Sequence, residues 1–135
     1  MKQVIGILTV ILSLTHLSLA NHHEDEHLLD GTSMNYFYQN GAGVKAKFEA
    51  GQFHFEWIEG PMKGITGREA YRSRKIGDKL YLINFTVQAN GTFVTLIFNF
   101  NQNVMYSSVL FAPGTDDEQT LFEGGIIEHL KLKEK

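Results

Sequence analysis

Alternation between apolar and polar residues is the feature that most constrains the fold of this chain. From Asn35 onward, side chains tend to alternate with a period of two along several short stretches. Neighbouring side chains of a strand point to opposite faces, so this period predicts strands covered on one face or on both. The stretches are residues 44–49, 53–58, 80–85, 92–100, 104–111 and 126–132. Beyond residue 20, no long stretch has the spacing of an amphipathic helix.

Short turn signals separate these stretches. They are Asn40-Gly41, Ala50-Gly51-Gln52, Gly77-Asp78, Asn90-Gly91, Asn101-Gln102 and Pro113-Gly114. Asn-Gly favours the left-handed conformations of tight hairpins. About eight or nine strands at this spacing predict a meander, and closing the meander into a barrel removes its unpaired edges. We therefore predict an all-β fold: a single antiparallel up-and-down β-barrel whose mouth can hold one small ligand.

Composition excludes several classes of function. The chain has 135 residues, which suits one domain. It contains no cysteine, so disulfides, thiolate metal sites and cysteine nucleophiles are excluded. With 12 basic and 15 acidic residues the net charge is -3, whereas a nucleic-acid partner would need a basic face. We predict no cofactor and no nucleic-acid partner, and the oligomeric state stays open.

The first twenty residues have the three-part layout of a secretory signal peptide. Met1-Lys2 is a short positive start, residues 4–14 are almost unbroken apolar sequence, and Ser18 and Ala20 are small residues spaced for cleavage. The alternative is an uncleaved membrane anchor, although the apolar run is shorter than the roughly 20 residues of a spanning helix. Residues 1–20 are thus predicted to be a signal peptide, which implies a periplasmic or secreted protein that leaves the membrane after cleavage.

Residues 21–33 form an acidic, His-rich segment. His23-Glu24-Asp25-Glu26-His27 matches the H-E-x-x-H pattern of zinc proteases, but no apolar face exists to bury such a helix. After cleavage, His23 would be the third residue from a free amine, a spacing that can bind Cu(II) or Ni(II). The preferred interpretation is a solvated, flexible leader without a metal.

Four motifs resemble the MoaF-like family of small lipocalin-like (calycin) barrels. They are Phe55–Pro61, Gly67–Tyr71, Lys79–Leu82 and Gly91–Asn99. The resemblance covers residues 35–111 and implies a calycin-type barrel over residues 34–135 with an internal cavity.

The same order of motifs is similar to that of phenolic acid decarboxylases. Tyr36-Phe37-Tyr38 matches their Tyr-x-Tyr, and Gly67-Arg68 matches their Gly-Arg step. The family's glutamate before a Gly-Thr pair has no counterpart, because residues 86–90 before Gly91-Thr92 contain no acid. The resemblance therefore implies the barrel and its cavity more firmly than the lyase reaction, and no catalytic residue is assigned.

Aromatic residues are the main candidates for a ligand site. Tyr36 and Tyr38 share a strand face, so two phenols could hydrogen-bond a carboxylate or carbonyl; packing with the hydroxyls at the rim is an equal alternative. Phe55 and Trp57 would supply apolar walls.

Arg68 and Tyr71 are candidates that compete for the interior. Arg68 could clamp a carboxylate, but Arg72 and Arg74 share its face while Tyr71 lies on the other. Burying three unpaired arginines would be costly, which favours an inward Tyr71 and a solvated arginine face.

Two functions follow from these candidates. The predicted one is an exported, non-catalytic barrel that binds a small, partly apolar ligand, with or without a carboxylate, through Tyr36, Tyr38, Phe55, Trp57, Arg68 and Tyr71. The alternative is a decarboxylase-like lyase that uses Tyr36, Tyr38 and Arg68.

Overall fold

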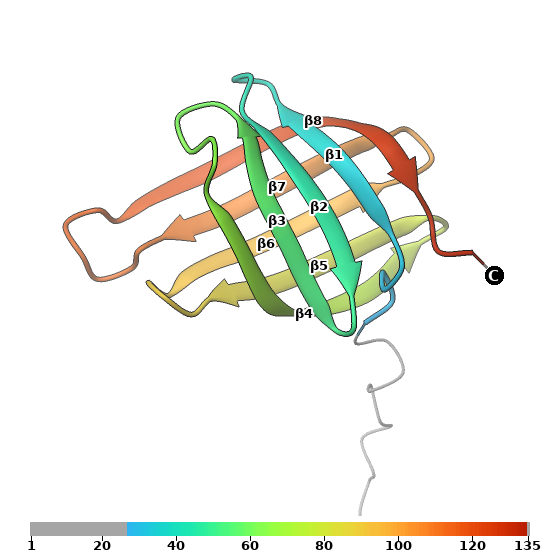
Figure 1. Ribbon diagram of the computed structural model, residues 1–135, viewed down its shortest axis with the longest axis horizontal. Coiled ribbons are helices and arrows are strands. Elements are labelled where there is room, and N and C mark those ends of the chain that lie inside the picture. Colours follow the sequence, from blue (N-terminus) through green and yellow to red (C-terminus); the bar gives the residue numbers. More distant parts are fainter. Residues whose placement is uncertain (1–26, 135) are drawn as a thin grey trace, which may run out of the picture.

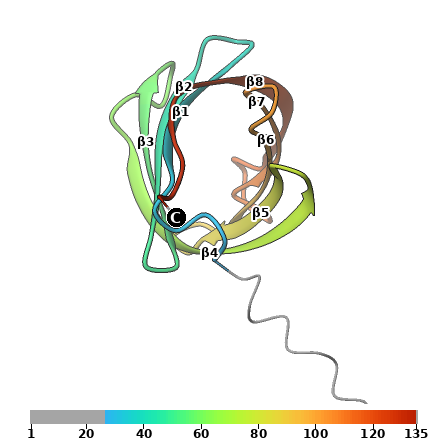
Figure 2. The ribbon, with the colours of Figure 1, turned by 90° about the vertical axis from the view of Figure 1, so that its right-hand side faces the viewer.

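The computed structural model describes residues 27–134, which fold into a closed antiparallel barrel of eight strands (Figure 1). The strands are β1 (Ser33–Tyr38), β2 (Gly43–Glu49), β3 (Gln52–Glu59), β4 (Thr66–Gly77), β5 (Leu80–Val87), β6 (Thr92–Asn99), β7 (Val104–Phe111) and β8 (Gln119–Lys131). Each strand pairs with the next, and β8 pairs with β1 to complete the ring seen in Figure 2. The predicted all-β up-and-down barrel is confirmed. The predicted signal peptide lies outside the described residues.

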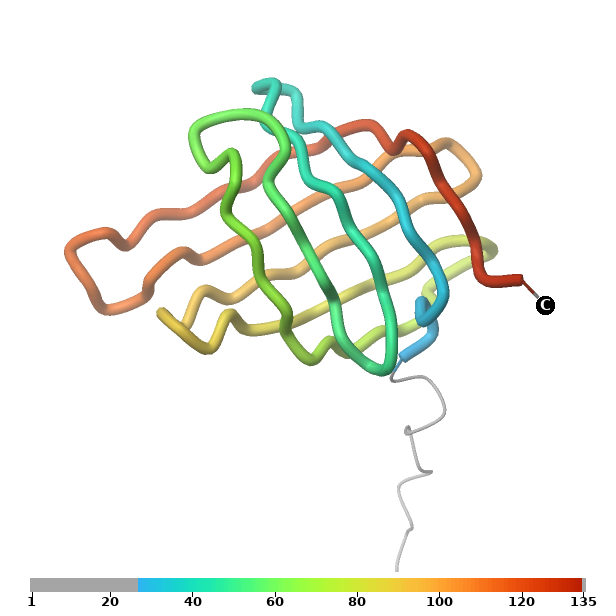
Figure 3. The backbone as a smooth tube through the Cα atoms, viewed as in Figure 1, coloured from blue at the N-terminus to red at the C-terminus, as the bar shows by residue number. Residues whose placement is uncertain are grey.

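The hairpin turns divide between the two ends of the barrel, as the tube in Figure 3 shows. Turns 39–42, 60–65, 88–91 and 112–118 form one end, which we call the mouth. Gly41 and Gly91 both have positive φ there, at 88° and 73°, as the two Asn-Gly signals predict. The preceding asparagine side chains accept hydrogen bonds from the backbone two residues on, which stabilises each turn.

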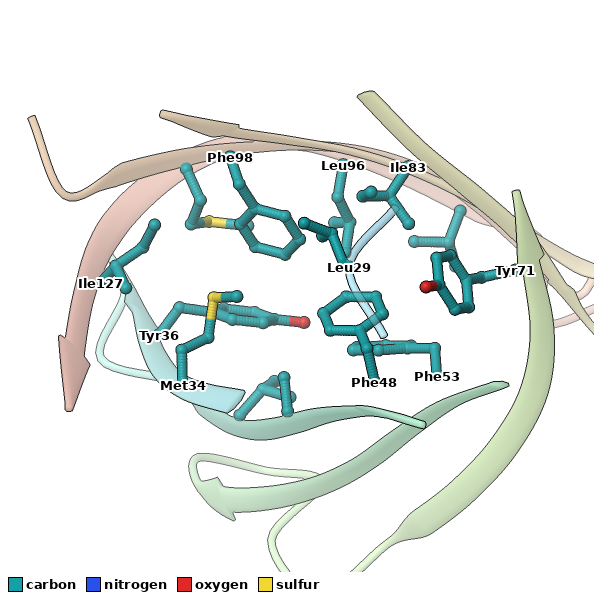
Figure 4. Close-up of a cluster of buried hydrophobic side chains, with 14 of the residues drawn as sticks. Leu29, Met34, Tyr36, Phe48, Phe53, Tyr71, Ile83, Leu96, Phe98 and Ile127 are labelled. Atoms are coloured by element: carbon teal, nitrogen blue, oxygen red, sulfur yellow. The ribbon is translucent and has the colours of Figure 1, made fainter. Parts of the chain in front are cut away.

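The opposite end, which we call the plugged end, holds most of the packed core (Figure 4). Phe48 lies at its centre, with ring centroids 4.9 Å from Phe53, 4.9 Å from Tyr71 and 6.1 Å from Phe98. These rings come from four different strands and are completely or almost completely buried. Burial of this much aromatic surface stabilises the fold.

Residues 27–32 close the plugged end. Leu29 is buried in the core, and Leu28 N donates to Ser73 Oγ at 2.8 Å. The Asp30 carboxylate accepts hydrogen bonds from Gly51 N at 3.0 and 3.1 Å and from the Tyr71 hydroxyl at 2.8 Å. The sequence prediction placed these residues in a flexible leader; instead they belong to the barrel, because Leu29 and Asp30 both find partners inside it.

A bulge in β8 alters the inward face near the end of that strand. Simple alternation over residues 126–132 groups Ile126 with Leu130, but Ile126 is 52% exposed and Ile127 is buried. The pairing with β1 shifts by one residue beyond Glu128, and His129 has a positive φ of 52°. The extra residue lets both Ile127 and Leu130 pack on the core.

The structure contains no membrane-spanning helix within residues 27–134.

Candidate functional site

The mouth of the barrel contains a cavity of about 180 Å³. Its walls come from seven of the eight strands, together with the loop between β3 and β4 and the turn between β5 and β6. The lining residues are Tyr36, Tyr38, Val44, Phe53, Phe55, Trp57, Met62, Ile65, Phe85, Val87, Asn90, Thr92, Val94, Val109, Phe111 and Leu121. None of them carries a charge. A mostly apolar wall with a few polar groups is typical of a site for a small molecule.

Two tyrosines from β1 supply polar atoms of this wall. Tyr36 and Tyr38 lie on the same face, as predicted, and their rings meet edge-on with centroids 5.7 Å apart. The Tyr38 ring also stacks on Trp57 at 6.1 Å. Burial raises the pKa of both phenols, most strongly for Tyr36, whose neighbour Tyr38 raises it further. Both hydroxyls therefore stay neutral and can donate or accept a hydrogen bond.

Phe55 forms a second wall because Gly67 leaves room for it. The Phe55 ring stacks on Phe53 at 5.6 Å and on Phe85 at 6.2 Å, and these two rings also contact each other at 4.8 Å, so the cluster links β3 to β5 across β4. A Cβ atom on Gly67 would overlap this ring. In the Gly67-Arg68 pair, the glycine thus serves to make room for the packing of the Phe55 ring.

The arginine of that step lies outside the barrel. Arg68 is exposed on the outer face of β4, together with Arg72 and Arg74, while Tyr71 is fully buried on the inner face. The favoured arrangement, in which Tyr71 points inward and the arginines face the solvent, is therefore confirmed. The prediction that Arg68 clamps a ligand is wrong for this cavity, because its side chain belongs to the face that points to solvent.

Tyr71 is also absent from the cavity wall. It lies at the plugged end, where its hydroxyl donates to Asp30 and its ring contacts Phe48 edge-on. Its role as a ligand-lining residue is thus corrected to a structural one, since the core rings separate it from the mouth. Of the predicted site residues, the structure brings together Tyr36, Tyr38, Phe55 and Trp57.

Comparison with known proteins supports the fold and places the chain in a family. The MoaF-like family model matches residues 30–123. The chain belongs to the MoaF-like family. Its barrel is similar to the crystal structure of a candidate beta-lactamase from Burkholderia vietnamiensis, with a TM-score of 0.67 and 17% sequence identity over 74% of this chain and 93% of that chain. At that identity the likeness shows the fold alone. No match is found among curated proteins.

The MoaF-like barrel has two interior polar residues that sequence reasoning missed, Ser107 and Glu123. They face each other across β7 and β8, beside Tyr38. Glu123 Oε2 is buried and lacks a hydrogen-bond partner among residues 27–134, and the buried Ser107 Oγ has the Tyr38 hydroxyl as its one hydrogen-bonding neighbour there. The available signal was the alternation of Leu121 and Ile127 with their neighbours, which places Glu123 on the inner face. Because Glu123 is an acidic residue at an inward position, it interrupts the apolar pattern that would mark the inner face of this strand.

The described residues hold no cluster of three or more His, Cys, Asp or Glu that could bind a metal ion. The histidine leader that suggested copper or nickel binding, with His23 at its centre, lies outside residues 27–134.

Proposed function

We propose that this MoaF-like barrel binds a small, mostly apolar molecule in the cavity at its mouth. The observation that carries the proposal is a hollow of about 180 Å³ beneath the mouth turns, above the buried side chains of the plugged end. An apolar cavity of roughly 150 Å³ holds a benzene ring. The expected ligand is therefore a single ring or a short chain with one polar group.

The polar group of this ligand would hydrogen-bond the phenols of Tyr36 and Tyr38, two buried hydroxyls of the wall. A carboxylate is disfavoured because no basic side chain lines the cavity and Arg68 lies on the outer face. A decarboxylase-like reaction that relies on Arg68 is disfavoured for the same reason. Binding without catalysis is the function that the geometry supports.

We also propose that the protein is exported to the periplasm or secreted. The layout of residues 1–20 supports this proposal. Mass spectrometry of the protein from its native host tests it, because cleavage predicts a first residue of Asn21. Recovery of an intact Met1 in a cytoplasmic fraction would contradict it.

Fluorescence of Trp57 tests the binding proposal directly, because it is the one tryptophan of the chain and lies in the cavity wall. Titration with 2-phenylethanol is expected to change its emission and to raise Tm, with a Kd in the roughly micromolar to millimolar range. Val109→Phe fills the cavity and should abolish both effects. The matched control is Leu110→Phe, which adds a ring one residue away and does not touch the cavity wall. Equal binding by both variants would refute the assigned site.

A further inference from the structure

Three polar side chains meet on the inner face beside the cavity. Ser107 of β7 lies directly opposite Glu123 of β8. Tyr38 of β1 pairs with Gly125, two residues further along β8, so its ring lies next to Glu123. Burial raises the pKa of Tyr38 most, hydrogen bonds with Ser107 and Tyr36 lower it, and the negative charge of Glu123 raises it, so Ser107 and Glu123 both lie close to the Tyr38 hydroxyl. Tyr38 is the member of this cluster that lines the cavity, and Ser107 and Glu123 lie beside its hydroxyl without lining the cavity themselves.

The cluster is incompletely satisfied within the folded chain. The buried Oε2 of Glu123 makes no hydrogen bond among the described residues, and the Oγ of Ser107, which is only 3% exposed, has no hydrogen-bonding neighbour there except the Tyr38 hydroxyl. Within residues 27–134, no lysine, arginine or histidine forms an ion pair with Glu123. Buried polar atoms are nearly always satisfied, because an unmade hydrogen bond leaves the cost of desolvation uncompensated. The missing partner is therefore a group that the folded chain does not supply.

The chemistry of the cluster defines that group. A carboxylate accepts hydrogen bonds and attracts positive charge, and the hydroxyls of Ser107 and Tyr38 can accept as well. A protonated amine has three donors, which matches one acceptor on each of the three residues. The stacked rings of Tyr38 and Trp57 add aromatic faces that favour a cation. A neutral hydroxyl would satisfy only one of these acceptors, and a carboxylate would be repelled.

We propose that Glu123, Ser107 and Tyr38 form a subsite for the protonated amine of a compact, otherwise apolar ligand whose ring or chain occupies the mouth cavity. This inference rests on the proposed function, because it places the body of the ligand in that cavity. It goes further by naming the ligand class as a small primary amine.

Three probes of equal body size test the subsite at neutral pH: 2-phenylethylamine, 2-phenylethanol and 3-phenylpropionate. The amine is expected to bind about tenfold more tightly than the alcohol, since a charge-assisted hydrogen bond is roughly twice as strong as a neutral one. The carboxylate is expected to bind most weakly. Glu123→Gln keeps the shape of the side chain and should reduce the affinity ratio of amine to alcohol from about ten to about one.

Glu128→Gln is the matched control, because Glu128 is exposed on the same strand and its loss should leave the ratio unchanged. Ser107→Ala is a second test, in which the affinity ratio of amine to alcohol should fall about threefold. This variant keeps the proposal testable if Glu123→Gln does not fold. If the protein binds the alcohol as tightly as the amine, the subsite proposal is overturned and the cavity proposal remains intact. A preference that survives Glu123→Gln would also overturn it. Absence of binding by all three probes would overturn both proposals.

Discussion

Tyr71 shows how a buried polar atom holds residues 27–32 in place at the plugged end. Its hydroxyl donates to Asp30 at 2.8 Å, and both oxygens of the same carboxylate share a bifurcated hydrogen bond from Gly51 N. His27 adds an edge-on ring contact at 5.2 Å. One carboxylate thus joins the entering chain, the β2–β3 turn and β4. The strength of this end depends on a hydrogen bond to a charged acceptor, which contributes more than a neutral one.

Tyr71→Phe should lower the free energy of unfolding by about 1–2 kcal/mol, because Asp30 loses a donor while the ring packing remains. Urea denaturation measures the change. Tyr106→Phe is the matched control, since Tyr106 is 55% exposed on the outer face and its hydroxyl should contribute little. Equal losses in the two variants would show that the Asp30 contact does not stabilise the plugged end.

Three interior tyrosines also predict how stability depends on pH. Burial raises the pKa of Tyr36, Tyr38 and Tyr71 in the folded state, and for Tyr71 the charge and hydrogen bond of Asp30 raise it further. Above about pH 10, the unfolded chain therefore loses protons that the folded barrel keeps. The free energy of unfolding should be constant with respect to these groups below that pH and should fall as the pH rises through it.

Urea denaturation at a series of alkaline pH values measures this fall, and phenolate absorbance should show the buried tyrosines ionising only as the barrel unfolds. Tyr36→Phe should make the fall shallower, because one of the linked protons is removed. A steep rise of phenolate absorbance from these tyrosines in the folded barrel would contradict their burial.

At the scale of elements, the seam between β1 and β8 closes the barrel, and a glycine permits it. A Cβ atom on Gly125 would overlap the backbone oxygen of Phe37 on β1. A backbone atom in a paired strand cannot move aside as the end of a side chain can. At the neighbouring Gly124, an added Cβ would press on the ring of Tyr106, which is exposed and can shift, and would lie 3.4 Å from the backbone oxygen of Met105, an ordinary contact distance. The two glycines are therefore adjacent in sequence and different in function.

Gly125→Ala should lower the free energy of unfolding by about 3 kcal/mol, because it forces the two strands apart. Gly124→Ala should change it by less than about 1 kcal/mol. Thermal or urea denaturation of the pair measures the difference. Similar stability of the two variants would mean that the seam tolerates a wider separation than the register indicates.

At the scale of the whole molecule, period-two alternation and the Asn-Gly turns were sufficient to predict the barrel. Alternation also predicted that Tyr71 points inward while Arg68 points outward. It could not predict that Tyr71 lies at the plugged end, because alternation assigns a strand face, whereas height along the barrel depends on how the strands are staggered. The bulge at His129 escaped prediction for a related reason, since one extra residue interrupts the period.

The candidate site was only partly predictable. Tyr36, Tyr38, Phe55 and Trp57 came from aromatic content and spacing, and the structure places all four in one wall. Glu123 was missed because interior positions are expected to be apolar, so a charged side chain is expected to face the solvent. Residues 27–32 were missed because acidic, polar sequence near a terminus resembles a mobile tail, whereas Leu29 and Asp30 depend on distant partners in β4 and the β2–β3 turn.

A crystal structure grown with 2-phenylethanol shows directly whether the mouth cavity of this MoaF-like barrel accepts a guest molecule. We expect one ordered ligand whose ring lies among Phe55, Phe85 and Val109 and whose hydroxyl reaches Tyr36 or Tyr38. A mouth closed by its own side chains, or a ligand bound only on the outer surface, would contradict it.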